Sequence, residues 1–111
     1  MKHFLFICSR NQWRRPTAEA VFKKYPGIAA RSAGTSRHAR RSVTLADIHG
    51  AELIFVMEDK HKARLLATFP RALQYKTPLV LNISDDYPYM DVGLIDLLKT
   101  RMAPYLPKDD A

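Results

Sequence analysis

The chain has 111 residues, of which 18 are lysine or arginine and 11 are aspartate or glutamate, so its formal net charge is +7. This length fits a single domain, 1–111. The composition, in which 47% of the residues are hydrophobic and 26% are charged, excludes a disordered or fibrous chain. A single cysteine excludes an intramolecular disulfide and suits a reducing compartment. The apolar run 4–8 is too short for a signal peptide or a membrane span, so we expect a cytoplasmic protein with no membrane partner.

Short apolar runs alternate with amphipathic stretches along the chain. Runs without alternation predict buried strands, and apolar residues that recur every three or four positions predict helices. In chain order the pattern predicts a strand over 3–7, a helix that begins at Pro16 and ends before Pro26, a strand over 28–33, a short helix over 43–49, a strand over 53–57, a helix over 60–69 with Leu65, Leu66 and Phe69 inward, a strand over 79–83 and a helix over 94–102. We expect a loose tail over about 104–111.

This alternation predicts an α/β fold, a small doubly wound four-stranded parallel sheet with helices on both faces. Ligands of such sheets bind outside the carboxyl ends of the strands. The segments expected at those ends are 8–15, 34–41, 57–59 and 84–91. The candidate site is therefore expected among them.

Segment 8–15 places the single cysteine where the first strand ends and a helix soon begins. Backbone N–H groups in such a turn can form an anion cradle, and the helix N-terminus adds positive potential. Both favour the thiolate of Cys8 near neutral pH. Arg14 can hold two phosphate oxygens at once, and Asn11 suits a tight turn. The spacing alone fits an inert buried cysteine beside solvated arginines equally well.

Four segments resemble the low-molecular-weight protein tyrosine phosphatase family, in the family's order and over nearly the whole chain. The first is a Cys-x5-Arg loop followed by a Pro-x-Ala-Glu helix start, and the others are similar to the family's Ser-Ala-Gly-Thr segment, its Ala-Asp-Leu-Ile strand and its Asp-Pro-aromatic loop. In this chain they are Cys8–Ala20, Arg31–Thr35, Ala51–Glu58 and Ile83–Tyr89.

The resemblance implies hydrolysis of a phosphate monoester through a phosphocysteine on Cys8, with no metal and no cofactor. It implies that Arg14 stabilises the transition state and that Asp85 is the general acid, with Asp86 as the alternative and Asp91 as a third candidate. The implied phosphate-binding residues are Ser9, Arg10, Asn11, Gln12, Trp13, Arg14 and Arg15. Ser32 matches a family serine that braces the loop asparagine, here Asn11.

Several positions depart from the family pattern. Arg10 stands where the family has glycine, and Arg15 stands where it has a serine or threonine whose hydroxyl bonds the thiolate. Arg15 either offsets that loss by its charge or faces the substrate. The usual Asp-Pro step is missing near Asp85, and the chain is shorter than the family between Thr35 and Ala51.

Alternative interpretations remain for several side chains. Trp13, Tyr87 and Tyr89 either line a pocket for an aromatic phosphate or only pack against the protein. The basic run 37–41 is more typical of a solvated face than of a recognition patch. The three histidines His38, His49 and His61 lack metal-ligand spacing, so no metal site is expected.

The expected partners are a phosphorylated protein or a small aryl phosphate, with inorganic phosphate or vanadate as inhibitor. The alternative function is a non-catalytic module that binds phosphate or a phosphoprotein. Arsenate reduction on this fold needs resolving cysteines that the chain lacks. Nucleic acid is a weaker candidate, because no nucleic-acid motif accompanies the basic residues.

Overall fold

The computed structural model describes residues 1–9, 14–84 and 86–106, and at residues 14 and 15 it describes the backbone alone. Strands and helices alternate along the described chain, as the sequence pattern predicts. The elements are β1 (Lys2–Cys8), α1 (Arg14–Phe22), β2 (Ile28–Gly34), α2 (Leu45–Gly50), β3 (Leu53–Val56), α3 (Asp59–Thr68), β4 (Leu79–Val80), α4 (Val92–Met102) and a 3-10 turn, η1 (Ala103–Tyr105).

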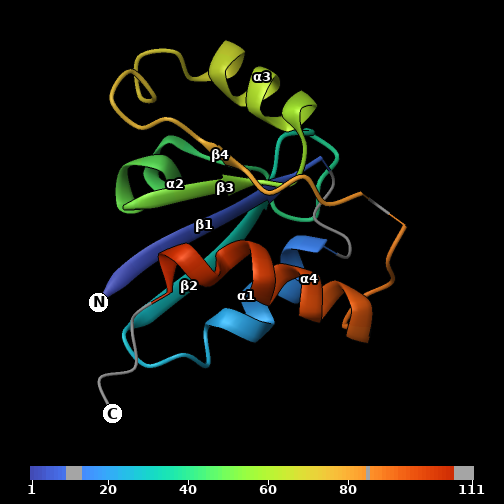
Figure 1. Ribbon diagram of the computed structural model, residues 1–111. Coiled ribbons are helices and arrows are strands. Elements are labelled where there is room, and N and C mark those ends of the chain that lie inside the picture. Colours follow the sequence, from blue (N-terminus) through green and yellow to red (C-terminus); the bar gives the residue numbers. More distant parts are fainter. Residues whose placement is uncertain (10–13, 85, 107–111) are drawn as a thin grey trace.

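The described strands form one parallel sheet in the order β2-β1-β3-β4 (Figure 1). Cys8, the last residue of β1, lies opposite Gly34, the last residue of β2. The chain places β2 on one side of β1 and β3 on the other, so the winding direction reverses beside β1. Such a reversal, at the carboxyl ends of the strands, is where open parallel sheets bind ligands.

Alternate residues of β1 point to opposite faces of the sheet. Phe4, Phe6 and Cys8 pack on the face covered by α1 and α4, whereas Leu5 and Ile7 pack on the face covered by α2 and α3 (Figure 1). Both faces of β1 are therefore buried, which explains why its sequence is apolar without alternation. The predicted doubly wound α/β fold is confirmed.

The third helix and the fourth strand differ in detail from the sequence prediction. Leu66 is 36% exposed, because it lies about 100° around α3 from the buried Leu65 and so leaves the inward stripe. Strand β4 has two residues instead of five, although the N–H groups of Leu81 and Ile83 still bond to carbonyls of the β3 chain. Asn82 between them has a left-handed φ of 56°, which interrupts the regular strand.

The start of the expected loose tail packs against the protein. The ring of Tyr105 lies 5.0 Å from that of Phe55, edge to face, and Leu106 also packs against this core. Residues 107–111 lie outside the described part of the chain. None of the helices that the structure describes is both long and apolar enough to cross a membrane.

Candidate active site

Cys8 is buried at the carboxyl end of β1, with 5% of its surface exposed. α1 begins at Arg14, two residues before the predicted start, which leaves Pro16 in the first turn, where no backbone N–H is needed. The strand that ends at the cysteine and the helix that follows are therefore both present, as the sequence predicts. The predicted loop residues Arg10, Asn11, Gln12 and Trp13 lie outside the described residues, as do the side chains of Arg14 and Arg15.

The backbone on the carboxyl side of Cys8 is held by the loop that follows β2. The N–H of Thr35 donates to the carbonyl of Cys8, and the N–H of Ser36 donates to the carbonyl of Ser9, both at 2.9 Å. The first bond belongs to the last pair of the β1–β2 ladder, Cys8 opposite Gly34, and the second holds Ser9, one residue beyond the strand. The backbone of Cys8 and Ser9 is thereby fixed to the loop that follows β2.

Gly34 makes this close approach possible. A Cβ atom at Gly34 would lie 2.6 Å from the carbonyl oxygen of Ser9 and 2.4 Å from the Cβ of Ala39. Both distances are far below van der Waals contact, and one of the opposing atoms belongs to the backbone. The glycine of the Ser-Ala-Gly-Thr segment is therefore required by the packing beside Cys8.

His61 is a site residue that the sequence argument missed. It lies in the first turn of α3, is 1% exposed, and its Nε2 is 3.1 Å from the Oγ of Ser9. In the sequence this histidine shows no metal-ligand spacing. Its position in the first helical turn after a buried strand, at the carboxyl edge of the sheet, is the signal that could have identified it.

Ser32 is buried at 4% exposure, and its hydroxyl donates to Oε2 of Glu19 on α1 at 3.3 Å. This bond joins β2 to the helix that follows the cysteine loop. The predicted bond from Ser32 to Asn11 involves a residue outside the described part of the chain. A role for Ser32 behind that loop therefore remains a prediction.

The segment 84–91 follows β4 at the same edge of the sheet. Asp85, the first candidate acid, lies outside the described residues. Asp86 is exposed and accepts a hydrogen bond from the hydroxyl of Ser84 at 3.1 Å. The carboxylate of Asp91 accepts from the N–H of Leu94 at 3.1 Å and so caps α4. Among the described residues, no group of three His, Cys, Asp or Glu side chains is arranged to hold a metal ion.

A hydrogen bond fixes this segment to α1. The N–H of Met90 donates to Oγ1 of Thr17 at 2.9 Å, and Thr17 is fully buried in the first half of α1. Tyr87 is half-buried against the core under α1 and α4, whereas Tyr89 is 52% exposed. The segment 84–91, which carries the candidate acids, is thus held beside α1, the helix that follows Cys8.

The arginines of the basic run 37–41 are all exposed, and one of them, Arg41, is also held by side-chain hydrogen bonds. The guanidinium of Arg41 donates to the carbonyl of Ser32 at 2.7 Å and to the carboxylate of Asp47 at 2.5 Å. Burial alone would raise the pKa of Asp47, but the N–H of Thr44 and the Arg41 guanidinium outweigh it and hold the pKa below its usual value. Arg37 and Arg40 are exposed.

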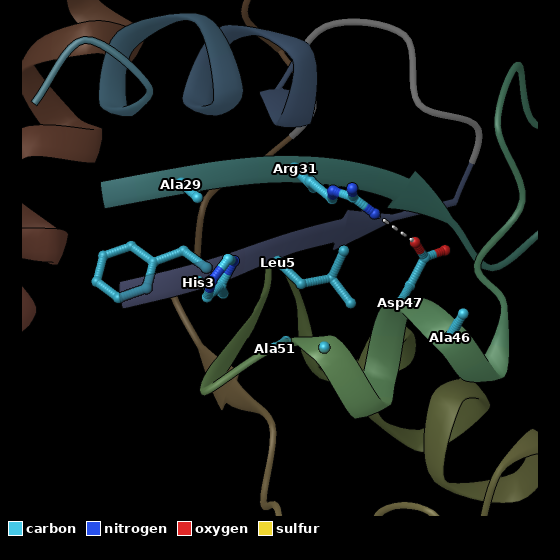
Figure 2. Close-up of a pocket in the computed structure, with 9 residues that line it drawn as sticks. His3, Leu5, Ala29, Arg31, Ala46, Asp47 and Ala51 are labelled. Carbon is cyan, nitrogen blue, oxygen red and sulfur yellow. Dashed lines mark ion pairs between the residues drawn. The ribbon is translucent and has the colours of Figure 1, made fainter. Parts of the chain in front are cut away.

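A cavity of about 290 Å³ lies away from the carboxyl edge of the sheet, on the face covered by α2 (Figure 2). Its walls come from the first halves of β1 and β2 and from α2, and include His3, Leu5 and Ala29. Arg31 and Asp47 also line the cavity, and Nη1 of Arg31 lies 3.9 Å from Oδ1 of Asp47. Among the described residues, neither Cys8 nor any other predicted site residue lines this cavity.

The amino-acid sequence matches no family model and no curated protein. The structure, in contrast, is similar to solved structures over nearly its full length. The low molecular weight protein tyrosine phosphatase SP-PTP from Streptococcus pyogenes matches with a TM-score of 0.75 and 15% identity, over 97% of this chain and 95% of that chain. The tyrosine phosphatase Wzb from Escherichia coli K30, in complex with phosphate, matches with a TM-score of 0.75 and 20% identity, over 94% and 95%.

A third similar structure is a cysteine-to-serine mutant of the YwlE arginine phosphatase with a phosphorylated active-site serine. It matches with a TM-score of 0.72 and 21% identity, over 97% of each chain. This chain therefore has the fold of the low-molecular-weight protein tyrosine phosphatases. The resemblance carried by four sequence segments is confirmed at the level of the fold.

Proposed function

We propose that this chain hydrolyses phosphate monoesters without a metal, with Cys8 as the nucleophile. The observation that carries the proposal is the position of Cys8: it is buried at the carboxyl end of β1, beside the reversal of the winding, and α1 begins six residues later at Arg14. A strand end followed closely by a helix N-terminus is a favourable place for a bound phosphate.

The proposed reaction has two steps. In the first, the Cys8 thiolate attacks phosphorus, an S–P bond forms, the P–O bond to the leaving group breaks, and Asp85 gives its proton to the departing oxygen. In the second, the Asp85 carboxylate takes a proton from water, which attacks phosphorus and releases phosphate and the thiolate. Arg14 and the loop N–H groups stabilise the equatorial oxygens in both steps.

Two similar structures support this proposal. One contains phosphate, and another contains a phosphorylated residue where its active-site cysteine was replaced. We propose phosphotyrosine in a protein, or a small aryl phosphate, as the substrate class. Trp13, Tyr87 and Tyr89 are the aromatic residues proposed to contact it. Because one similar structure is an arginine phosphatase, phosphoarginine belongs in the substrate panel.

Arg10 and Arg15 favour a second candidate function, a module that binds phosphate without hydrolysing it. Arg15 stands where the family has a hydroxyl for the thiolate, and both arginines add positive charge around a bound anion. Arg15→Ser is therefore informative. A large gain in rate would support a native loop whose arginine favours binding over turnover.

The experiment that separates the two functions is hydrolysis of a chromogenic aryl phosphate from about pH 4 to about pH 8, with a chelator present. Native protein and Cys8→Ser are compared, and orthovanadate and phosphate binding are measured for both. Turnover that disappears in Cys8→Ser supports the phosphatase. Anion binding without turnover in the native protein contradicts it and favours the binding module.

A further inference from the structure

A buried histidine from α3 contacts the residue that follows the candidate nucleophile. His61 Nε2 lies 3.1 Å from Ser9 Oγ, between residues 52 positions apart in the sequence. The contact crosses from the end of β3 to the end of β1, the two strands beside the reversal of the winding. His61 is 1% exposed, so its ring is held by packing and does not reach Ser9 by chance from solvent.

The second ring nitrogen determines where the proton of His61 lies. Nδ1 is 3.1 Å from the backbone nitrogen of Glu58, and that nitrogen can only donate. Nδ1 therefore accepts and carries no proton, which places the proton of the neutral ring on Nε2. Nε2–H then donates to Ser9 Oγ at 3.1 Å, a shorter approach than the 3.8 Å from Nε2 to Oε2 of Glu58.

Ser9 is held at two points. The hydroxyl oxygen accepts from His61, and the carbonyl accepts from the N–H of Ser36 at 2.9 Å. Since the oxygen receives the histidine proton, the hydrogen of the Ser9 hydroxyl is not donated to His61. Ser9 is therefore held in orientation both at its backbone and at its side chain, one residue after Cys8.

We infer that His61 is a positioning residue for the phosphate-binding loop and that it acts through the hydroxyl of Ser9. The inference rests on the proposed function. A loop whose N–H groups must converge on one anion binds more strongly when its first residue is fixed in advance. The neutral ring with its proton on Nε2 supplies that fixed point, and the Glu58 N–H selects this tautomer.

Two substitutions separate the two nitrogens of His61. In His61→Asn the amide oxygen can still accept from the Glu58 N–H, as Nδ1 does, but the side chain is too short to reach Ser9. In His61→Gln the longer side chain can place its NH₂ group near the position of Nε2 and can donate to Ser9. Ser9→Ala removes the same contact from the other end and leaves the Ser36 bond to the Ser9 carbonyl intact.

We expect His61→Asn to lower kcat/KM for an aryl phosphate, and the affinity for phosphate, by about tenfold, with an unfolding midpoint close to native. His61→Gln should recover most of the loss. Ser9→Ala should lose as much as His61→Asn, and the double variant Ser9→Ala/His61→Asn should lose no more than either single variant. In native protein, ¹⁵N NMR should show His61 protonated on Nε2, and its Nε2 signal should shift in Ser9→Ala.

Unchanged kcat/KM and phosphate affinity in His61→Asn would overturn the inference, as would losses that add in the double variant or a proton on Nδ1. Activity that falls only in proportion to unfolding would show a merely structural role and would also overturn it. Cys8→Ser reports on the proposed function separately. If native protein binds phosphate but does not hydrolyse the ester, the proposed hydrolase function is contradicted. The phosphate affinities of the variants still decide whether His61 positions the loop.

Discussion

The hydroxyl of Thr17 on α1 accepts a hydrogen bond from the backbone N–H of Met90 at 2.9 Å. The two residues are 73 positions apart, and Met90 has a left-handed φ of 59°. This contact fixes the segment that carries the candidate acids to the helix that follows the cysteine loop. We therefore expect the buried hydroxyl of Thr17 to help hold the segment 84–91 against α1.

Thr17→Val keeps the shape of the side chain but removes the acceptor for the Met90 N–H. We expect a loss of about 1–3 kcal/mol in the free energy of unfolding, because the amide is left without its partner. We also expect a lower kcat for aryl phosphates with poor leaving groups, since the acid segment loses its anchor. Urea unfolding and steady-state kinetics measure the two effects.

Thr100→Val is the matched control, because the hydroxyl of Thr100 bonds only within α4, to the carbonyl of Asp96, and is exposed. It should leave the kinetics unchanged. Equal kinetic effects of the two valine variants would contradict an anchoring role for Thr17.

Asp85→Ala should slow hydrolysis by about a hundredfold for esters with poor leaving groups and much less for good ones. The reason is that a departing oxygen of high basicity needs the proton more than one of low basicity. The measurement is the dependence of kcat on leaving-group pKa across a series of aryl phosphates. Asp86→Ala is the control, since the carboxylate of Asp86 is exposed and accepts from Ser84. A steeper dependence in Asp86→Ala, with none in Asp85→Ala, would reassign the acid.

The sequence predicted the order and type of the elements because β1 and β3 are apolar runs buried on both faces. It also predicted that Cys8 ends a strand before a helix. It could not show the contacts of His61 with Ser9 or of Thr17 with Met90, because these side chains are 52 and 73 residues from their partners and a local pattern does not identify a distant partner. Side-chain periodicity also misplaced Leu66, whose exposure depends on how α3 meets the sheet.

Gly34→Ala tests the close approach beside Cys8. The added methyl would meet the Ser9 carbonyl at 2.6 Å, so the loop after β2 or the turn after Cys8 must move. Because a displacement of about 1 Å at a catalytic group can cost on the order of 10²-fold, we expect a large fall in kcat/KM together with weaker phosphate binding. Gly50→Ala is the control, since nothing lies within 4 Å of its Cβ position. Native kinetics in Gly34→Ala would contradict the packing argument.

Asp47→Asn tests the buried carboxylate that accepts from Arg41 and Thr44. The pKa of Asp47 is lower in the folded protein than its ordinary value of about 3.9, so ionised Asp47 stabilises the fold at any pH above that value. This stabilisation is lost as the pH falls below the ordinary pKa and through the lower pKa of the folded state. We therefore expect native protein to be about 1–3 kcal/mol more stable than Asp47→Asn at pH 7, with the difference shrinking below about pH 4.

Urea unfolding at neutral and acid pH measures this difference. If the difference in free energy of unfolding between native protein and Asp47→Asn is the same at neutral and at acid pH, the stabilising role of ionised Asp47 is contradicted.

Arg37 and Arg40 are exposed on the loop that holds the backbone of Cys8 and Ser9, while Arg41 is held by Asp47 and Ser32. Exposed positive charge near an anion site raises the rate of encounter with negative substrates and is screened by salt. We expect Arg37→Ala/Arg40→Ala to raise KM several-fold for an acidic phosphopeptide at low salt and to flatten its salt dependence, with kcat unchanged. Lys99→Ala/Arg101→Ala, which removes two exposed positive charges from the last turn of α4, is the matched control. If both variants change the salt dependence equally, the effect belongs to net charge and not to this loop.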